Sequence, residues 1–203
     1  MMQRDDPHLP EAGTQALLFD CDGTLVETMH LHRMSWGRIF ERYGFTITDE
    51  WWDRYANVAL APFVRAVIPD ADDALLVELL DEANVDFNAS LHLAEPVEHV
   101  IELAREYRGR LPIAVVTGGY RDVIIPTLEG AGIAELFDTI VTADDVVHSK
   151  PAPDVYATAM ARLGVEPSQC VAYEDSDIGI ASARAAGVGR VVDVRDWPLG
   201  APD

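Results

Sequence analysis

Positive charge is scarce in this sequence. Its 203 residues include a single lysine, Lys150, and fourteen arginines, against 35 aspartates and glutamates, so the formal net charge is −20. A chain with this balance cannot neutralise the phosphates of a nucleic acid or an anionic membrane surface, and we expect neither as a partner. The acidic excess is typical of a solvated protein surface or of adaptation to high salt, and the salt dependence of stability distinguishes the two.

Cysteines and long apolar runs are also scarce. The two cysteines, Cys21 and Cys170, fall in or beside predicted buried strands, where we expect free thiols rather than a disulfide. Residues 1–13 are polar, contain two prolines and lack the apolar segment of a signal peptide, and no later run reaches membrane-spanning length. We therefore expect a cytoplasmic protein in which residues 1–13 form a flexible tail.

Short apolar runs alternate with helical patterns along most of the chain, and 49% of the residues are hydrophobic, as in a globular protein. This alternation is typical of the α/β class with a doubly wound parallel sheet. The pattern predicts strands at 16–20, 112–117, 138–142, 170–174 and 190–194, and helices near 97–108, 120–130, 152–163 and 177–186.

Residues 28–94 interrupt this rhythm with several helical stretches and no convincing strand. We therefore expect an α/β core formed by residues 14–27 and 95–203, with a small helical insertion that could close over the site as a lid. Trp51 and Trp52 are expected in the core of the insertion, although an aromatic pair facing a cleft could stack on a sugar. The first helix carries an apolar stripe made of Leu31, Met34, Trp36, Ile39, Phe40 and Tyr43.

Two carboxylates, Asp20 and Asp22, follow the first apolar run where a buried strand is expected to end. Alternate residues of a strand face the same way, so both acids could converge on one spot, and Gly23 permits a sharp turn beyond them. Neighbouring acids repel each other unless a cation or a shared proton intervenes, and open α/β sheets bind ligands at the carboxyl ends of their strands. The pair indicates a metal-assisted reaction centre.

Two later strand ends carry a hydroxyl group and a cation. Thr117, followed by Gly118 and Gly119, could cradle phosphate oxygens, although turns and helix caps use the same residues. Lys150 lies between the third strand and a helix preceded by prolines. Because arginine supplies every other fixed positive charge, a lysine here indicates a need for a compact ammonium group, the alternative being a leftover surface lysine.

A second pair of acids, Glu174 and Asp175, ends the fourth core strand. These residues could add oxygen ligands to the centre predicted at the first strand, giving the carboxylate-rich environment that Mg²⁺ prefers. Asp177 fits the role of a helix cap better. Four acids at one edge of a sheet require a divalent cation and a nearby ammonium group.

In this order, the motifs resemble those of the haloacid dehalogenase (HAD) superfamily of phosphotransferases and phosphatases, and the resemblance covers almost the whole chain. The resemblance is carried by Asp20-Cys-Asp-Gly-Thr-Leu-Val, Thr117, Lys150-Pro and Glu174-Asp175. The sequence is also similar to the β-phosphoglucomutase-like subgroup in the Lys-Pro-Ala-Pro-Asp run, at Gly179 and in the segment 183–187. This similarity implies a Rossmann-like core with a helical cap. The segment 145–195 is most similar to bacterial fructose-1-phosphate and 6-phosphogluconate phosphatases.

The resemblance implies a role for each motif residue. Asp20 would attack phosphorus to form an aspartyl phosphate, and Asp22 would protonate the leaving oxygen and then activate water. Thr117 and the amide of Gly118 would bind phosphoryl oxygens, while Lys150 would stabilise the charge on Asp20 and on the transferring group. The implied Mg²⁺ site is formed by Asp20, Asp22 through its carbonyl, Glu174 and Asp175. The implied substrate- or phosphate-binding residues are Thr24, Gly118, Gly119 and His32.

Several functions remain open within and beyond this resemblance. Dehalogenation is disfavoured because dehalogenases of the superfamily usually lack an acid at the position of Asp22. A phosphosugar mutase is the main alternative, but His32 and Trp36 match a cap-hinge pattern that mutases and phosphatases share. Residues 84–91 contain no basic residue to hold a second phosphate, and Arg54 and Arg65 are the remaining candidates.

We therefore expect a monomeric, Mg²⁺-dependent phosphatase that acts on a small phosphorylated metabolite, the monophosphate of a sugar, polyol or sugar acid. A catalytically silent protein that only binds such metabolites is a further alternative. The complete set of acids, hydroxyl and lysine argues against it.

Overall fold

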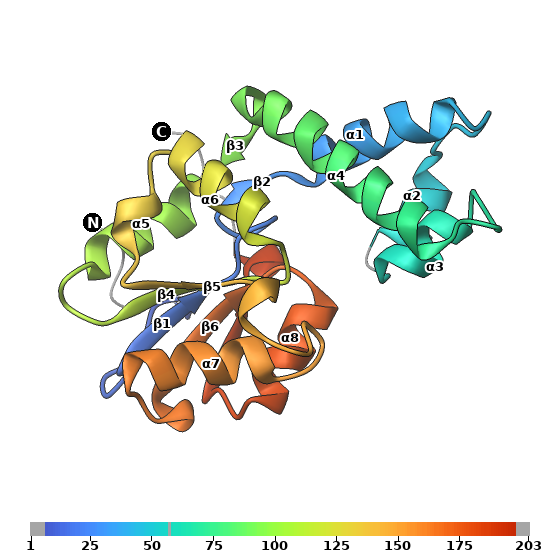
Figure 1. The fold of residues 1–203 in the computed structure, drawn as a ribbon. Coiled ribbons are helices and arrows are strands. Elements are labelled where there is room, and N and C mark those ends of the chain that lie inside the picture. The colour runs from blue at the N-terminus through green and yellow to red at the C-terminus, as the bar shows by residue number, and fades with distance from the viewer. Residues whose placement is uncertain (1–6, 57, 198–203) are drawn as a thin grey trace. The chain divides into compact units, whose positions relative to one another are not determined.

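A five-stranded parallel sheet in the order β5-β4-β1-β6-β7 forms the centre of the larger part of the molecule (Figure 1). The computed structural model describes residues 7–56 and 58–197. The strands are β1 (Ala16–Phe19), β4 (Ile113–Val116), β5 (Thr139–Val141), β6 (Cys170–Glu174) and β7 (Arg190–Asp193). The predicted α/β class is confirmed, and each predicted core strand lies within one residue of its observed bounds.

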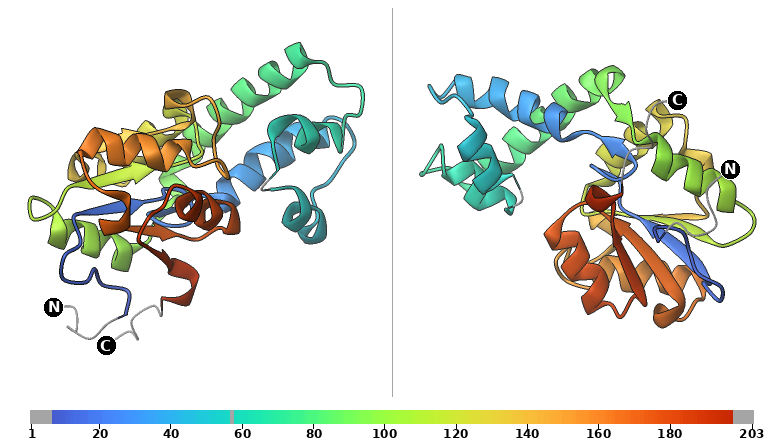
Figure 2. Two further views of the ribbon diagram at one scale, coloured as in Figure 1. Left: turned by 90° about the horizontal axis from the view of Figure 1, so that it is seen from below. Right: turned by 180° about the vertical axis from the view of Figure 1, so that it is seen from behind.

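Helices cover both faces of this sheet because its strands are apolar on both sides. They are α5 (Glu98–Tyr107), α6 (Arg121–Gly130), α7 (Asp154–Leu163) and α8 (Asp177–Ala185). Helices α7 and α8 lie on one face, and α5 and α6 lie on the other (Figures 1 and 2). Along β1, Leu18 belongs to the core cluster that includes Met160 of α7, whereas Phe19 stacks on Tyr173 with ring centroids 4.9 Å apart.

Residues Thr28–Ala94 form a second compact unit, which is helical throughout its regular structure. Its helices are α1 (Met29–Glu41), α2 (Asp49–Tyr55), α3 (Leu60–Arg65), α4 (Asp73–Ser90) and the short 3-10 helix η1 (Leu91–Leu93). Phe40 and Phe63 lie in a core of this unit alone, and Trp51 and Trp52 pack against that core. The expected packing role of the two tryptophans is confirmed.

Two local details differ from the sequence-based expectation. Tyr43 is 46% exposed and outside the apolar stripe, because α1 ends at Glu41 and the chain turns at Gly44, whose φ is +74°. A two-stranded antiparallel ribbon, β2 (Val26–Glu27) with β3 (Glu95–Pro96), was not predicted. Strands of two residues are too short to show a periodic pattern.

The beginning of the chain contacts the sheet unit. The predicted tail spans residues 1–13, of which 1–6 lie outside the described residues. The phenol of Tyr173 donates to the carbonyl of His8 at 2.9 Å, and Arg190 donates to the carbonyl of Leu9 at 2.9 Å. These bonds join residues 8 and 9 to core strands, and the flexible tail expected at residues 1–13 stays a prediction.

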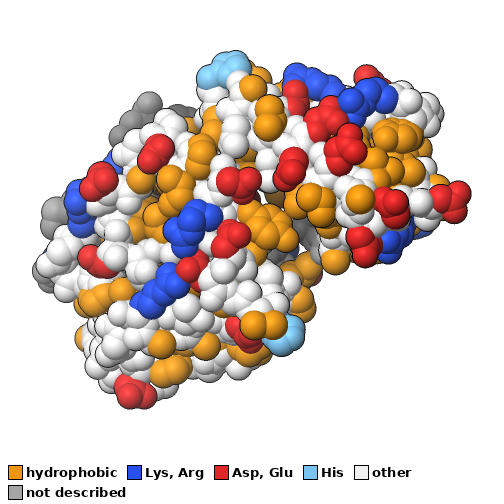
Figure 3. All heavy atoms as spheres, viewed as in Figure 1, with side chains coloured by type: hydrophobic (Ala, Val, Ile, Leu, Met, Phe, Trp, Pro, Cys, Tyr) orange, Lys and Arg blue, Asp and Glu red, His pale blue; other side chains and the backbone are white. Residues whose placement is uncertain are grey.

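The structure also shows the state of the two cysteines, the character of the helices and the distribution of charged side chains. Cys21 and Cys170 are free and buried. Among the described residues, none of the helices combines the length and the apolar character needed to cross a bilayer. On the face drawn in Figure 3, basic side chains (blue) lie beside acidic ones (red) rather than forming one continuous basic patch.

Candidate active site

Three neighbouring strands bring polar residues to one edge of the sheet. Asp20 follows β1, Thr117 follows β4, and Glu174 is the last residue of β6. Strand β1 lies between the other two, and the backbone N–H of Asp20 donates to the carbonyl of Tyr173 at 3.0 Å. Because parallel strands end at the same edge, residues from distant parts of the sequence lie side by side there.

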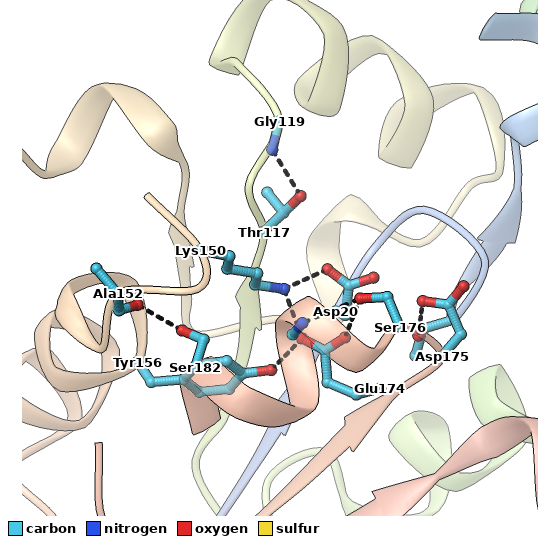
Figure 4. Close-up of polar contacts among 12 residues, drawn as sticks. Asp20, Thr117, Gly119, Lys150, Ala152, Tyr156, Glu174, Asp175, Ser176 and Ser182 are labelled. Atoms are coloured by element: carbon cyan, nitrogen blue, oxygen red, sulfur yellow. Dashed lines mark hydrogen bonds and ion pairs between the residues drawn. The ribbon is translucent and has the colours of Figure 1, made fainter. Parts of the chain in front are cut away.

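The chain's only lysine lies between two of these carboxylates (Figure 4). The Nζ atom of Lys150 is 2.6 Å from Oδ1 of Asp20 and 2.6 Å from Oε1 of Glu174. The exposed fractions of the three side chains are 7% for Lys150, 9% for Asp20 and 0% for Glu174. Lys150 is therefore a buried bridging cation, and the alternative of a leftover surface lysine is wrong.

The charges at this edge do not balance. Burial and the nearby Glu174 raise the pKa of Asp20 well above its ordinary value, and Lys150 offsets this only in part. Burial alone would lower the pKa of Lys150, but its two carboxylate partners hold that pKa above the ordinary value. Burial and Glu174 also raise the pKa of Asp175 to about 7. One ammonium group faces more carboxylates than it can neutralise, so the site favours a further cation.

Three of the acids are placed to hold such a cation. Side-chain oxygens of Asp20, Glu174 and Asp175 all lie within 4.8 Å of one another. Carboxylate oxygens are the ligands of hard cations such as Mg²⁺. Gly23, whose φ is +83°, permits the close approach of Asp175, since a Cβ atom at residue 23 would lie 2.2 Å from Oδ2 of that side chain. The donor atoms, the charge excess and this approach fit a bound divalent cation.

Asp22 is placed differently from the expectation. Strand β1 ends at Phe19, and Asp22 forms an isolated bridge with Val26 in the following turn. Asp22 therefore does not continue the alternation of a strand, and the expectation that it faces the same way as Asp20 for that reason is wrong. Its carboxylate is not one of the three clustered groups among the described residues, although its charge contributes to the raised pKa of Asp20. The predicted metal contact through the Asp22 carbonyl stays a prediction.

The threonines and glycines predicted to bind phosphate differ in their exposure and in their hydrogen bonds. The hydroxyl of Thr117, which is 1% exposed, accepts a hydrogen bond from the amide of Gly119 at 3.0 Å. This bond engages the Gly119 amide locally, whereas Gly118 is exposed beside it. Thr24 is 0% exposed and donates to Oδ1 of Asp175 at 3.4 Å. The expected phosphate contacts of all these residues stay predictions.

Two other expected residues have clear partners. His32 of α1 stacks on Phe87 of α4 with ring centroids 4.2 Å apart, and its expected substrate contact stays a prediction. Helix α8 is capped by Ser176, whose hydroxyl accepts from the amide of Gly179 at 3.1 Å. Asp177, expected as the cap, instead pairs with Arg195 at 2.9 Å.

Two buried hydroxyl groups that were not predicted from the sequence support the site. The phenol of Tyr156 donates to Oε1 of Glu174 at 2.5 Å, and Ser182 donates to the carbonyl of Ala152 at 2.6 Å, beside the loop of Lys150 (Figure 4). Both residues lie on helices and look like ordinary packing residues in the sequence. No sequence signal separates them from the core, because their partners come from other elements.

Comparisons with known proteins agree with this arrangement. A family model described as haloacid dehalogenase-like hydrolase matches residues 17–192. The fructose-1-phosphate phosphatase YqaB of Escherichia coli (strain K12) is 36% identical over 191 residues, covering 88% of this chain and 95% of that protein. The validoxylamine A 7'-phosphate phosphatase of Streptomyces hygroscopicus subsp. limoneus is 36% identical over 176 residues, covering 84% and 81%.

Solved structures also resemble the chain. The structure of CbbY from Rhodobacter sphaeroides in complex with phosphate has a TM-score of 0.79 and 26% sequence identity, covering 89% of this chain and 86% of that one. A mutant of the same protein, solved with xylulose-(1,5)bisphosphate, has a TM-score of 0.78 at the same coverage. The similarity thus extends to the helical unit as well as the sheet.

Proposed function

The chain belongs to the haloacid dehalogenase-like hydrolases, and we propose that it is a Mg²⁺-dependent phosphatase that hydrolyses the monophosphate of a small sugar, polyol or sugar acid. The observation that carries the proposal is the Lys150 ammonium group, buried 2.6 Å from Asp20 at the end of β1. Two relatives that are 36% identical are named as a fructose-1-phosphate phosphatase and a validoxylamine A 7'-phosphate phosphatase, which supports the substrate class.

Asp20 is the proposed nucleophile. A carboxylate oxygen forms a bond to phosphorus while the bond from phosphorus to the substrate oxygen breaks, and Asp22 donates a proton to that leaving oxygen. Asp22 then takes a proton from water, which attacks phosphorus and breaks the bond to Asp20. The products are inorganic phosphate and the free alcohol, and both carboxylates return to their starting state.

Lys150 stabilises charge in both steps. An ammonium group has three N–H donors, and two of them are directed at Asp20 and Glu174. The third is available for a phosphoryl oxygen, together with the hydroxyl of Thr117 and the amide of Gly118. Asp20, Glu174 and Asp175 would hold Mg²⁺, which when bound supplies further positive charge at the phosphoryl group.

The charges of the helical unit favour a substrate with a single phosphate. Its arginines each lie within 4.0 Å of a carboxylate, in the pairs Arg33–Asp49, Arg38–Asp86, Arg42–Glu82, Arg54–Glu50 and Arg65–Asp73. Arg65 also donates to the carbonyl of Ala71 at 2.9 Å, so it supports the fold of this unit. A second phosphate would compete with these carboxylates for the guanidinium groups, which disfavours the mutase alternative.

Phosphate release from a panel of sugar, polyol and sugar-acid monophosphates, with Mg²⁺ and with a chelator, tests the proposal. We expect Mg²⁺-dependent release that Asp20→Asn abolishes without preventing folding. Release by Asp20→Asn at the wild-type rate contradicts the aspartyl-phosphate mechanism. If no ester is hydrolysed but glucose 1-phosphate isomerises in the presence of its bisphosphate, the enzyme is a mutase. Silence in both assays indicates a binding protein.

A further inference from the structure

Tyr156 takes no part in the mechanism described above, yet it contacts two residues of the site. It lies in the first turn of α7, which follows the loop that carries Lys150, and its side chain is completely buried. We infer that Tyr156 is a positioning residue that fixes the Glu174 carboxylate and thereby holds the Lys150 ammonium group against Asp20. The inference rests on the proposed function for its kinetic test only.

The first contact is the hydrogen bond from the phenol to Glu174. The hydroxyl of Tyr156 lies 2.5 Å from Oε1, the same oxygen that accepts from Nζ of Lys150 at 2.6 Å. A buried hydroxyl bonded to an ionised carboxylate makes a stronger bond than one between neutral groups. The result is a continuous chain of contacts from Tyr156 through Glu174 and Lys150 to Asp20.

The second contact is between the aromatic ring and the ammonium group. Nζ of Lys150 lies 5.4 Å from the centroid of the Tyr156 ring, within the range of a cation–π interaction. The ring therefore limits the movement of Lys150 on one side, while the hydroxyl fixes its carboxylate partner. A phenylalanine would supply the ring but not the hydrogen bond.

The other neighbours of Glu174 also restrict the position of its carboxylate. Its second oxygen, Oε2, lies 3.4 Å from the hydroxyl of Ser176. A Cβ atom at position 179 would lie 1.9 Å from Oε2, so Gly179 leaves room that the carboxylate occupies. Tyr156 adds a short hydroxyl bond to Oε1, the oxygen that also accepts from Lys150. Without the phenol, Glu174 would lose a contact that fixes its carboxylate, and Lys150 would lose a fixed partner opposite Asp20.

The test compares Tyr156→Phe with Tyr173→Phe. Tyr173 is the matched control, because it is equally buried and its hydroxyl donates to the carbonyl of His8 at 2.9 Å, away from the site. With a monophosphate at saturating Mg²⁺, we expect Y156F to lower kcat about tenfold with KM within about twofold, as for a group acting on the transition state. Y173F should leave both constants within about twofold.

A double-mutant cycle with Glu174→Gln separates positioning from a general loss of packing. If Tyr156 acts through Glu174, the effects are not additive, and Y156F should lower kcat less than about twofold in the E174Q background. Full additivity would show that the phenol acts on the core rather than on Glu174.

The single lysine provides a measurement that does not need turnover. Protein labelled with ¹³C and ¹⁵N in lysine has one set of lysine NMR signals, those of Lys150. We expect Y156F to move the Lys150 Cε–Hε signals by more than their linewidth and Y173F to leave them in place. In the wild type, these signals should show nuclear Overhauser contacts to the ring of Tyr156, which tests the geometry even if Y156F does not fold.

The outcomes are distinct for the two proposals. The inference is overturned if Y156F retains wild-type kcat and Lys150 signals, if both variants lose activity equally, or if the Overhauser contacts are missing. If the wild type hydrolyses no phosphate ester, the proposed function fails, and the Lys150 signals alone decide the role of Tyr156.

Discussion

Replacement of Lys150 by methionine removes the charge that joins Asp20 to Glu174 while keeping an unbranched side chain. The lysine side chain is 7% exposed, and its partners are 9% and 0% exposed. Loss of one partner from a buried ion pair costs about 3–5 kcal/mol, because the other charges stay buried without compensation. For a protein of this size each 1 kcal/mol lowers Tm by roughly 2–4 °C, so we expect K150M to lose about 6–20 °C in the absence of Mg²⁺.

Arg195→Met is the matched control for this loss. Arg195 also bridges two carboxylates, at 2.9 Å to Asp177 and 2.6 Å to Asp193, but its side chain is 49% exposed. Exposed ion pairs contribute about 0–1 kcal/mol, since water solvates the charges left behind. Thermal unfolding should therefore show a far smaller change in Tm for R195M than for K150M.

A second substitution tests the reason for the loss. In K150M the remaining carboxylates repel each other, so adding Glu174→Gln should recover part of the stability that K150M loses. Turnover should stay at least about a hundredfold below wild type in both variants, because the charge at the phosphoryl group is not restored. A K150M protein with wild-type Tm, or a double variant less stable than K150M alone, would refute the electrostatic argument.

Three further outcomes are expected. Gly179→Ala places a Cβ atom 1.9 Å from Oε2 of Glu174 and should lower kcat roughly tenfold or more, whereas Gly37→Ala, whose Cβ atom would have no neighbour within 4 Å, should keep the wild-type kcat and add about 0.5–1 kcal/mol of stability. Equal kcat values for the two variants contradict the clash. Burial raises the pKa of Asp145, but the hydrogen bonds from Arg162 and Thr142 and the charge of Arg121 together outweigh burial and lower this pKa. The stabilisation is therefore present above the ordinary pKa of about 3.9 and is lost as the pH falls through the folded value. In urea unfolding, Asp145→Asn should therefore be destabilised at pH 7 and less so at about pH 3, and an equal effect at both pH values contradicts this. Removal of Mg²⁺ by a chelator should abolish phosphate release, and added Mg²⁺ should restore it; chelator-resistant release contradicts the metal assignment.

The order of strands and helices in the core was predictable because it depends on local patterns. Apolar runs such as 113–116 and the helical periods between them are properties of neighbouring residues. The edge that carries Asp20, Thr117 and Glu174 also follows from sequence, since parallel strands end on the same side. Composition and position together drew attention to Lys150, the single lysine, which lies between a strand and a helix preceded by prolines.

The partners of these groups could not be predicted in the same way. Asp20 and Lys150 are 130 positions apart, and their 2.6 Å contact depends on how β1 and the loop before α7 pack. The bond of the Gly119 amide to the Thr117 hydroxyl and the burial of Thr24 likewise became visible only in the folded chain.

The residue types that reach the site can be read from the amino-acid sequence, whereas the hydrogen bonds and ion pairs among them depend on how the elements pack. Tyr156 shows the difference most clearly: helical periodicity places its ring in the core, but nothing in that period says that its hydroxyl meets Glu174. The physical reason is that periodicity sets the direction of a side chain from its own element, whereas a hydrogen bond depends on the packing of several elements at once.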